Sequence, residues 1–359
     1  MSAGSGTAVR VPPPHEAPFT NGIRHPELWL WDSWVMRVGG ALELYCLALA
    51  RQTRAGRPIG LREFNAYPFH YRRFTSVDDG RSWRDRGAVL HPGNVADGSD
   101  AGNVWSGSVT PLQDGRVLFG YTGISHAGPE RHFVQSAVFA AGTVDGPDTF
   151  PAAAQSHPIR DRAAIVAAGY YLPEDNIGFD HGEGDGPILA WRDPFVIELP
   201  DGRLNALWSA KVTDTVPALA HAVLSRGDDG AWSLALQPPI TLPDASEYTQ
   251  AEVPKLCRDA DTGELLLMIS SCDRLQESQP DSEVSKQLRL YRSADIAGPW
   301  RPAFAHGAAI PGTDVLFGAS FMDTSASGGR ARIVSPYWAA APDGLPMSIA
   351  PVQTVPLGD

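Results

Sequence analysis

The sequence predicts an all-β fold, a five-bladed β-propeller with a funnel-shaped active site at its centre. Three observations lead to this prediction. Apolar runs are short and are separated by turn residues, with 36 Gly and 31 Pro in 359 residues. One hairpin layout recurs five times, at an irregular spacing of roughly 60 to 90 residues. Helical periodicity, in contrast, is scarce.

Each of the five hairpins has a short strand, a tight turn that contains Gly, and a second apolar strand. Asp-Gly and Gly-Gly pairs fit such turns, because both central residues of a two-residue hairpin need positive φ. A β-sandwich or a jelly roll also supplies many short strands, but five copies of one layout favour a propeller. The predicted strand pairs are Ser33–Val38 with Leu42–Leu49, Ser108–Leu112 with Val117–Tyr121, Phe195–Leu199 with Leu204–Trp208, Val253–Cys257 with Glu264–Ser270, and Ala319–Asp323 with Ala331–Pro336.

A second repeat follows three of these hairpins. Tyr71–Trp83 has the Ser-x-Asp-x-Gly-x-x-Trp spacing of the Asp-box turn found in several propellers, and Ala222–Trp232 and Leu290–Trp300 are looser copies. In such a turn the Asp accepts backbone N–H groups while the aromatic residue packs inside the blade. A structural role is therefore expected for the three turn aspartates, Asp78, Asp228 and Asp295.

Composition limits the domain organisation and the partners. One propeller domain is expected over residues 19–359, after a flexible, Pro-rich arm over residues 1–18. The arm lacks an apolar h-region and no stretch approaches about 18 apolar residues, so a cytoplasmic protein is expected, or one exported by an unrecognised route. The net charge of −12 argues against nucleic acid and anionic membranes as partners, because both select basic surfaces. Oligomeric state is left open.

The cysteines and histidines show no pattern that predicts a disulfide, a metal site or a cofactor. Cys46, Cys257 and Cys272 are odd in number and lack metal-ligand spacing, so buried free thiols are expected. The ten histidines are scattered, without ligand spacing. The acidic run Asp175–Gly186, which includes His181, is expected to form a solvated loop beside the binding site. No metal ion and no other cofactor is therefore expected.

Four motifs are expected to meet at the centre of the propeller. The innermost strands line a central channel, so residues at their starts converge although they are far apart in the sequence. The motifs at these positions are Trp31-Asp32-Ser33-Trp34, Trp105-Ser106-Gly107-Ser108, Trp191-Arg192-Asp193-Pro194 and Ala251-Glu252-Val253-Pro254. The expected site contains three carboxylates inside a circle of indoles, namely Asp32, Asp193, Glu252, Trp31, Trp105 and Trp191.

Carboxylates among aromatic rings are suited to a small neutral sugar. Aromatic faces stack on the C–H surface of a sugar, while carboxylates and Arg192 bind its hydroxyls. One carboxylate can attack the anomeric carbon while another, kept protonated, donates a proton to the leaving oxygen. A third can hold ring hydroxyls as positive charge develops in the transition state.

These four motifs, in this order, resemble those of the levansucrases and inulosucrases of glycoside hydrolase family 68, whose clan also contains the invertase-like family. The resemblance covers roughly Trp29–Trp338, with one motif on each of four successive blades. It implies a retaining β-fructofuranoside-processing enzyme, a fructosyltransferase, a β-fructofuranosidase or both. Such an enzyme acts on sucrose or a related small fructoside through a covalent fructosyl-enzyme intermediate.

The resemblance also implies roles for the matching residues. Asp32 would be the nucleophile, Glu252 the general acid/base and Asp193 the transition-state stabiliser. In a retaining enzyme the carboxyl groups of Asp32 and Glu252 would lie about 5–5.5 Å apart. Ser106 would orient Asp32. Substrate contacts would come from Trp31, Trp105, Ser106, Arg192 and Arg274.

The chain departs from the family pattern on the leaving-group side. The family usually has Glu-Arg-Pro at the acid/base motif and another acidic residue two positions earlier, where this chain reads Gln250-Ala251-Glu252-Val253-Pro254. The Tyr of the fifth blade is missing from Val315-Leu316-Phe317-Gly318. The fructose side is intact. Transfer or removal of a fructosyl unit is therefore expected, while sucrose as donor and long fructan as product are left open.

Two other classes of protein stay open. A lectin-like propeller would bind fructosides without cleaving them, and the intact Asp32, Asp193 and Glu252 argue against it. A propeller glycosidase of different specificity, such as a sialidase, would use an Asp box. It would also need three arginines for a carboxylate and a Tyr nucleophile, and the acidic net charge fits a sugar acid poorly.

Overall fold

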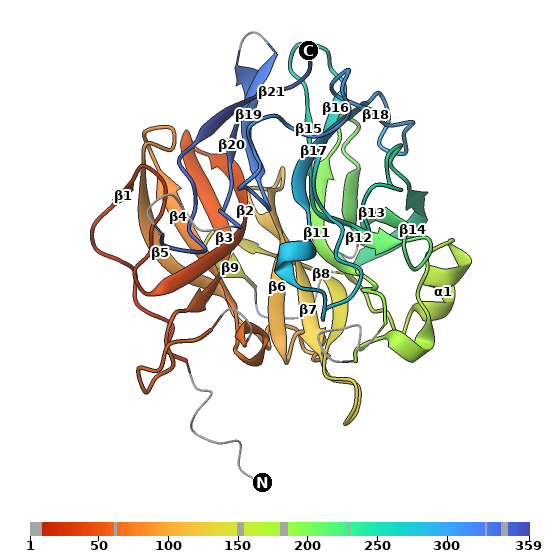
Figure 1. Ribbon diagram of the computed structural model, residues 1–359, viewed down its shortest axis with the longest axis horizontal. Coiled ribbons are helices and arrows are strands. Elements are labelled where there is room, and N and C mark those ends of the chain that lie inside the picture. The colour runs from red at the N-terminus through yellow and green to blue at the C-terminus, as the bar shows by residue number, and fades with distance from the viewer. Residues whose placement is uncertain are drawn as a thin grey trace.

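The computed structural model describes residues 9–60, 63–148, 154–179, 186–228, 230–326, 329–338 and 344–359. Five antiparallel sheets surround a central channel (Figure 1), which confirms the predicted five-bladed β-propeller. In each sheet the main strands follow one another along the chain from the channel outward, and the exceptions are two-residue strands in the first and second sheets. Within the described ranges, no helix has the length and apolar character needed to cross a bilayer.

The first two blades contain ten strands. Blade 1 consists of β2 (Leu28–Val38), β3 (Ala41–Ala50), β4 (His70–Ser76) and β5 (Ser82–Leu90), with β1 (Phe19–Thr20) at its outer edge. Blade 2 consists of β6 (Asn103–Pro111), β7 (Val117–Ser125), β8 (Val134–Thr143) and β10 (Ala154–Ser156), with β9 (Gly146–Pro147) also paired to β8.

The other three blades are smaller. Blade 3 consists of β11 (Arg192–Glu198), β12 (Leu204–Lys211), β13 (Pro217–Arg226) and β14 (Trp232–Ile240). Blade 4 consists of β15 (Gln250–Arg258), β16 (Leu265–Cys272), β17 (Lys286–Ser293) and β18 (Arg301–Pro302), and blade 5 of β19 (Ser320–Ala326), β20 (Arg330–Val334) and β21 (Gln353–Pro356). Among the described residues, one short helix, α1 (Arg162–Ala167), and 3-10 turns at Phe64–Ala66, Glu174–Asn176 and Asp281–Glu283 lie in loops.

All five predicted hairpins are present, as β2/β3, β6/β7, β11/β12, β15/β16 and β19/β20. Four of the five inner strands begin earlier than the sequence predicts, since β2 starts at Leu28 and β15 at Gln250, whereas the fifth begins one residue later, at Ser320. Most of the four motifs therefore lie within strands rather than before them. Gly39 and Gly40 join β2 to β3 with φ of 55° and 87°, as a two-residue hairpin requires.

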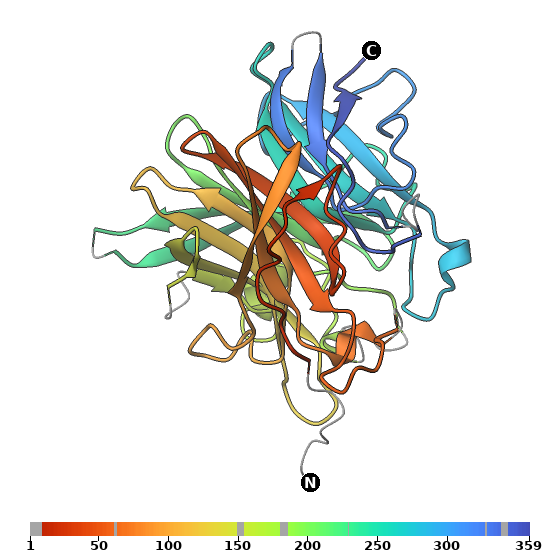
Figure 2. The ribbon, with the colours of Figure 1, turned by 90° about the vertical axis from the view of Figure 1, so that its left-hand side faces the viewer.

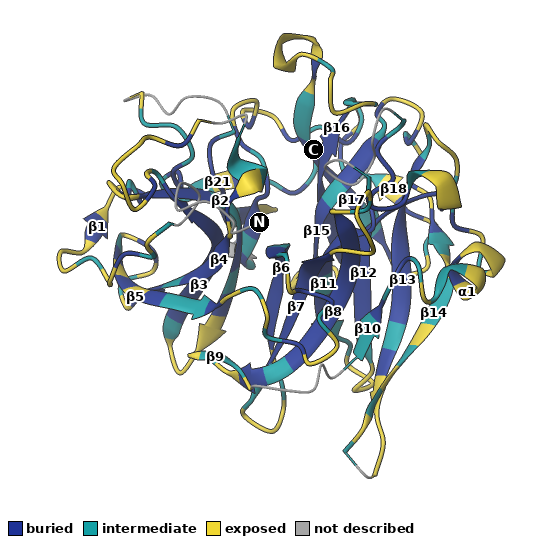
Figure 3. Ribbon diagram, turned by 90° about the horizontal axis from the view of Figure 1, so that it is seen from below, coloured by how far each residue is buried: buried dark blue, intermediate teal, exposed yellow. Residues whose placement is uncertain are grey.

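The hydrophobic core is divided into five clusters, one between each pair of neighbouring blades. Trp34 packs in the cluster that joins blade 1 to blade 2, and Met322 in the cluster that joins blade 5 to blade 1. Because both faces of each sheet are covered, inner strands such as β16 are buried along their whole length. Figure 3 shows the buried residues around the channel and the exposed ones on the connecting loops.

Hydrogen bonds between the first and last blades close the circle of blades. Ile23 and Ile349 exchange two backbone bonds of 2.9 and 3.1 Å, and the Leu30 N–H donates to the Met347 carbonyl at 2.9 Å. In Figure 2 the N-terminal segments, in red, lie beside the C-terminal segments, in blue. The innermost strand β2 consequently has β6 on one side and β19 on the other.

Residues 9–18, where the sequence predicts part of a flexible arm, contact blade 1. The buried guanidinium of Arg72 donates to the carbonyls of Pro12 and Pro13, both at 2.8 Å. It also forms a two-bond ion pair with Asp85, at 2.8 and 2.5 Å. The His15 N–H donates to the same carboxylate at 2.8 Å. These contacts hold residues 12–15 against β4 and β5.

The Asp box of blade 1 has its predicted structural role. Asp78 accepts the Ser82 N–H at 2.9 Å and the hydroxyls of Ser76 and Ser82 at 2.8 and 2.6 Å. These hydrogen bonds lower the pKa of Asp78 to about 2. Trp83 is buried inside the blade.

The long segment that follows β8, which has no strong sequence pattern, contains β9 and β10 of blade 2 and then α1 in its described part. Residues 180–185 of the acidic run Asp175–Gly186, His181 among them, lie outside the described residues. The expectation for that part of the loop stays a prediction.

Asp85→Ala would leave the Arg72 guanidinium buried without its carboxylate. Because an uncompensated buried charge is strongly destabilising, we expect the free energy of unfolding to fall by about 3–5 kcal/mol in urea denaturation. The matched control is Asp79→Ala, which removes an exposed pair with Arg37 and should change it by less than about 1 kcal/mol. Equal effects of the two substitutions would contradict this account.

Candidate active site

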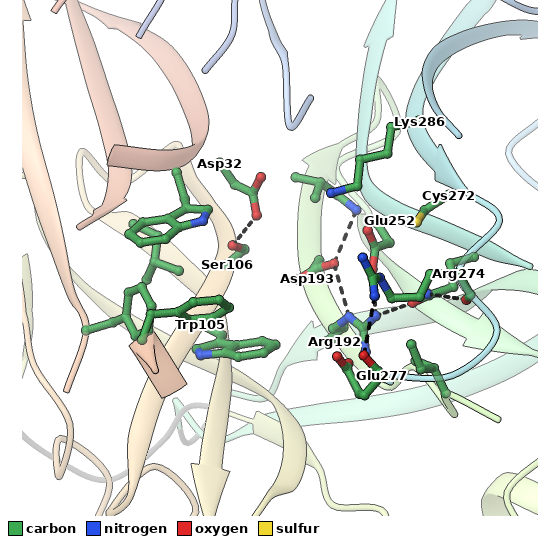
Figure 4. Close-up of a pocket in the computed structure, with 17 residues that line it drawn as sticks. Asp32, Trp105, Ser106, Arg192, Asp193, Glu252, Cys272, Arg274, Glu277 and Lys286 are labelled. Atoms are coloured by element: carbon green, nitrogen blue, oxygen red, sulfur yellow. Dashed lines mark hydrogen bonds and ion pairs between the residues drawn. The ribbon is translucent and has the colours of Figure 1, made fainter. Parts of the chain in front are cut away.

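A cavity of about 190 Å³ opens where the inner strands of blades 1 to 4 begin (Figure 4). The structure brings the predicted site residues, with the exception of Trp191, to this one pocket, although they come from different blades. The predicted residues that line it are Trp31, Asp32, Trp105, Ser106, Arg192, Asp193, Glu252 and Arg274. In Figure 4, Asp32 and Ser106 lie on one side of the pocket, and Asp193, Arg192 and Glu252 on the other.

Each of the four inner strands breaks its hydrogen-bond ladder at its motif. The pairing register shifts between Leu30 and Ser33, Trp105 and Gly107, Arg192 and Phe195, and Glu252 and Lys255. Such bulges leave residues unpaired and change the direction of their side chains. The irregularity explains why residues that are neighbours in one strand can both face the pocket.

Two bulge residues have unusual backbone conformations. Asp193 has φ of 64° and Val253 has φ of 49°, in the left-handed region that a β-branched residue rarely adopts. Hydrogen bonds between blades hold both conformations. The Asp193 N–H donates to Thr122 Oγ1 at 2.8 Å, and the Val253 N–H donates to Asp193 Oδ2 at 3.3 Å. Strain of this kind clusters at functional sites.

Asp32 is held by residues of blades 2 and 5. The Ser106 hydroxyl donates to Asp32 Oδ2 at 2.5 Å, as expected of a residue that orients this carboxylate. Gly318 packs so closely that a Cβ on it would lie 2.1 Å from Asp32 Oδ1. Burial raises the pKa of Asp32, while the Ser106 bond and the charges of Lys255 and Lys286 lower it.

Arg192 links the two carboxylates on the far side of the pocket. It donates to Glu252 Oε1 at 2.6 Å, and its Nε lies 3.9 Å from Asp193 Oδ2. It also donates to Gln250. The bulge in β11 allows Arg192 and Asp193 to face the same side, which a regular strand would forbid. Burial raises the pKa of Asp193, and the Arg192 charge opposes that shift.

The aromatic wall differs from the prediction in one residue. Trp31 and Trp105 line the pocket, as predicted, together with Phe64 and Phe69. Trp191 does not: it packs in the core between blades 2 and 3. The prediction for Trp191 is wrong because β11 begins at Arg192. Trp191 therefore belongs to the preceding loop, and its side chain packs in the core.

Arg274 lines the pocket, but its guanidinium forms hydrogen bonds within the loop that follows it. It donates to the Gln279 carbonyl and to Asp281. Its carbonyl accepts the amide of Gln250 at 2.8 Å. A direct contact between this guanidinium and a substrate would require these bonds to be exchanged.

Several pocket residues were not predicted from the sequence. Lys286, Glu277 and Cys272 line the cavity, and burial raises the pKa of the Cys272 thiol to about 12. Lys286 Nζ lies 5.3 Å from the ring of Phe317, beside the fifth blade. The rarity of lysine is a sequence signal that could have drawn attention to Lys286. Only three of the 29 Lys and Arg residues of the chain are Lys.

Four carboxylates line the pocket, those of Asp32, Asp193, Glu252 and Glu277. Over the described ranges, no set of three or more His, Cys, Asp or Glu side chains is arranged to hold a metal ion.

Comparison with known proteins agrees with the fold. No protein-family model and no curated protein matches the sequence. Inulosucrase from Halalkalicoccus jeotgali bound to kestose is similar in structure, with a TM-score of 0.60 and 19% identity, covering 99% of this chain and 90% of that chain. Bacillus subtilis levansucrase has a TM-score of 0.61 and 16% identity, covering 95% of this chain and 87% of its own. The structures confirm the propeller fold that the resemblance to levansucrases and inulosucrases predicts.

The raised pKa of Asp32 predicts how stability depends on pH. When a carboxyl group binds its proton more tightly in the folded state, the protein loses stability as the pH rises above the ordinary pKa of that group, which is 3.8 for Asp32. Asp32→Asn mimics the protonated form, so its melting temperature should exceed that of the wild type by about 2 °C or more at pH 8. The difference should shrink toward pH 4.

Asp78→Asn is the matched control, because the pKa of Asp78 is lowered and not raised. This variant should lose stability relative to the wild type at pH 8. A difference for Asp32→Asn that is constant from pH 4 to pH 8 would contradict the burial argument.

Proposed function

We propose that this protein is a retaining glycoside hydrolase or fructosyltransferase that acts on a small β-fructofuranoside. The observation that carries the proposal is the meeting of Asp32, Asp193 and Glu252 in one pocket, with Ser106 bonded to Asp32. Similar structures were determined with kestose and, for one levansucrase variant, with sucrose. A fructoside of that size is therefore the substrate to test first.

In the proposed reaction, Asp32 attacks the anomeric carbon of the fructosyl unit while the bond to the leaving oxygen breaks. Glu252 donates its proton to that oxygen. In the second step Glu252 takes a proton from water or from a sugar hydroxyl, which attacks the anomeric carbon and releases Asp32. Asp193 and Arg192 would bind fructose hydroxyls, with Trp31 and Trp105 as the apolar wall.

The size of the pocket favours a single sugar unit. Its volume of about 190 Å³ is smaller than the roughly 300–1,000 Å³ of pockets that hold drug-sized ligands. On the leaving-group side, Val253 stands at the position of the arginine in the family motif, and the Arg274 guanidinium is engaged in its own loop. We therefore propose a short donor, such as sucrose or a related small fructoside, and a small acceptor or water.

One set of incubations separates the functions. The protein is given sucrose, short fructo-oligosaccharides and simple fructosides, and free glucose, free fructose and larger products are followed together. With sucrose, glucose in excess of fructose indicates transfer, and equal release indicates hydrolysis. Measurable binding without turnover would support a fructoside-binding lectin and would reject the enzyme.

Asp32→Ala should lower turnover of the active fructoside by about 10⁴-fold or more, because the nucleophile and the acid act as a unit. Asp201→Ala removes an aspartate in an exposed hairpin turn and should leave turnover unchanged. Both variants are compared by initial rates, and circular dichroism checks that they fold. Activity near that of the wild type in Asp32→Ala would reject this residue as the nucleophile.

Gly318→Ala tests the close contact with Asp32. The new Cβ would displace the carboxylate, and a misplacement of about 1 Å costs on the order of 10²-fold in kcat/KM. Gly202→Ala is the matched control, since Gly202 also has positive φ but has nothing within 4 Å of the added atom. Equal activities of the two variants would show that Asp32 tolerates the displacement.

A further inference from the structure

Lys255 is a buried amine that the proposed reaction does not use. It is only 2% exposed, and its Nζ has no hydrogen-bond partner in the part of the chain that the structure describes. Its Nζ lies 5.8 Å from the ring centroid of Phe195 of β11. An ammonium group without such partners is expensive to bury, so its position requires another explanation.

The other two lysines have ordinary partners. Lys211 is equally buried, but its Nζ donates to the Asp214 carbonyl at 2.8 Å. Lys286 is half-buried at the pocket, with Nζ 5.3 and 5.1 Å from the rings of Phe317 and Trp338. Most basic residues of this chain are arginines, and Lys255 is the buried lysine whose Nζ has no hydrogen-bond partner among the described residues.

Carboxylates of the pocket supply the countercharge for Lys255. It follows the bulge in β15 that begins at Glu252, and the groups that stabilise its charge are Asp32 and Asp193. Burial lowers the pKa of Lys255 to about 8, so the amine is still mostly protonated at neutral pH. A compact ammonium suits this place, because the larger guanidinium of arginine would need several more hydrogen-bond acceptors.

Lys255 is one of two positive charges that stabilise the ionised form of Asp32. Arg192 lies beside Glu252 and Asp193, so it neutralises the far side of the pocket. Cys46 and Tyr71 also interact electrostatically with Asp32, but burial raises the pKa of both groups, so they are neutral. The charged groups that act on Asp32 are Lys255 and Glu252 of β15, Lys286 of β17 and Asp193 of β11.

We propose that Lys255 is a positioning residue that acts through Asp32, keeping it a carboxylate at the half-buried position that it occupies in the pocket. The amine does not line the pocket, so it does not need to touch the sugar. The role of Asp32 in this inference rests on the proposed function. The coupling between the two charges does not, and it can be measured without any substrate.

The first test measures that coupling by NMR. With ¹³C at the lysine Cε, the three lysines give three resonances, and Lys255→Met identifies the one from Lys255. Its titration midpoint should lie near 8 in the wild type. In Asp32→Asn it should fall by about half a unit or more, because a neighbouring negative charge is lost. The Lys211 resonance serves as the control and should titrate alike in both proteins.

An unchanged Lys255 midpoint in Asp32→Asn would overturn the inference, even if the enzyme acts on fructosides. This measurement keeps the native Lys255, so it does not depend on whether a variant at that position folds. A coupled midpoint in a protein that shows no fructoside turnover would reject the proposed function and support the charge pairing.

The second test is the pH profile of kcat/KM for Lys255→Met, with the fructoside that the wild type turns over. Loss of the cation should move the acidic limb upward by about one pH unit or more, because Asp32 then ionises less easily. KM should change little compared with kcat. Lys211→Met, which removes an equally buried lysine elsewhere in the fold, should keep the wild-type profile. An acidic limb at the wild-type position in a folded Lys255→Met would overturn the inference.

Discussion

Closure between blades 5 and 1 is the constraint on which the pocket depends. The backbone bonds between Ile23 and Ile349 join the two ends of the chain, and the Ser33 N–H donates to the Gly318 carbonyl at 3.1 Å beside Asp32. Because each core cluster lies between two blades, an open circle would expose one face of β2 and leave a sheet edge uncovered. The strand that carries Asp32 is thus held from both sides.

Hydrogen bonds also connect the pocket residues across four blades. Ser106 donates to Asp32, the Thr122 hydroxyl donates to the Ser106 carbonyl at 3.0 Å, and the Asp193 N–H donates to Thr122. The Val253 N–H then donates to Asp193. Burying like charges and strained backbone in one place is unfavourable, so stability must come from elsewhere. The five clusters between blades are its source.

Much of the architecture could be predicted from local sequence, and the details of the pocket could not. Hairpin turns such as Gly39-Gly40 and the Asp box around Asp78 depend on neighbouring residues, so their patterns are visible in the sequence. The direction of Trp191 depends on where β11 begins. The environment of Lys255 is created by Asp32 and Asp193, which belong to other blades, so no local pattern reveals it.

The scarcity of lysine has a practical consequence for anyone who wishes to couple this protein to a support or a dye. Lys211 and Lys255 are buried, which leaves the side chain of Lys286 as the accessible lysine, and it lies at the pocket. Reagents that modify lysine side chains would therefore react with the protein at the pocket. A lysine introduced on an outer loop would give a safer point of attachment.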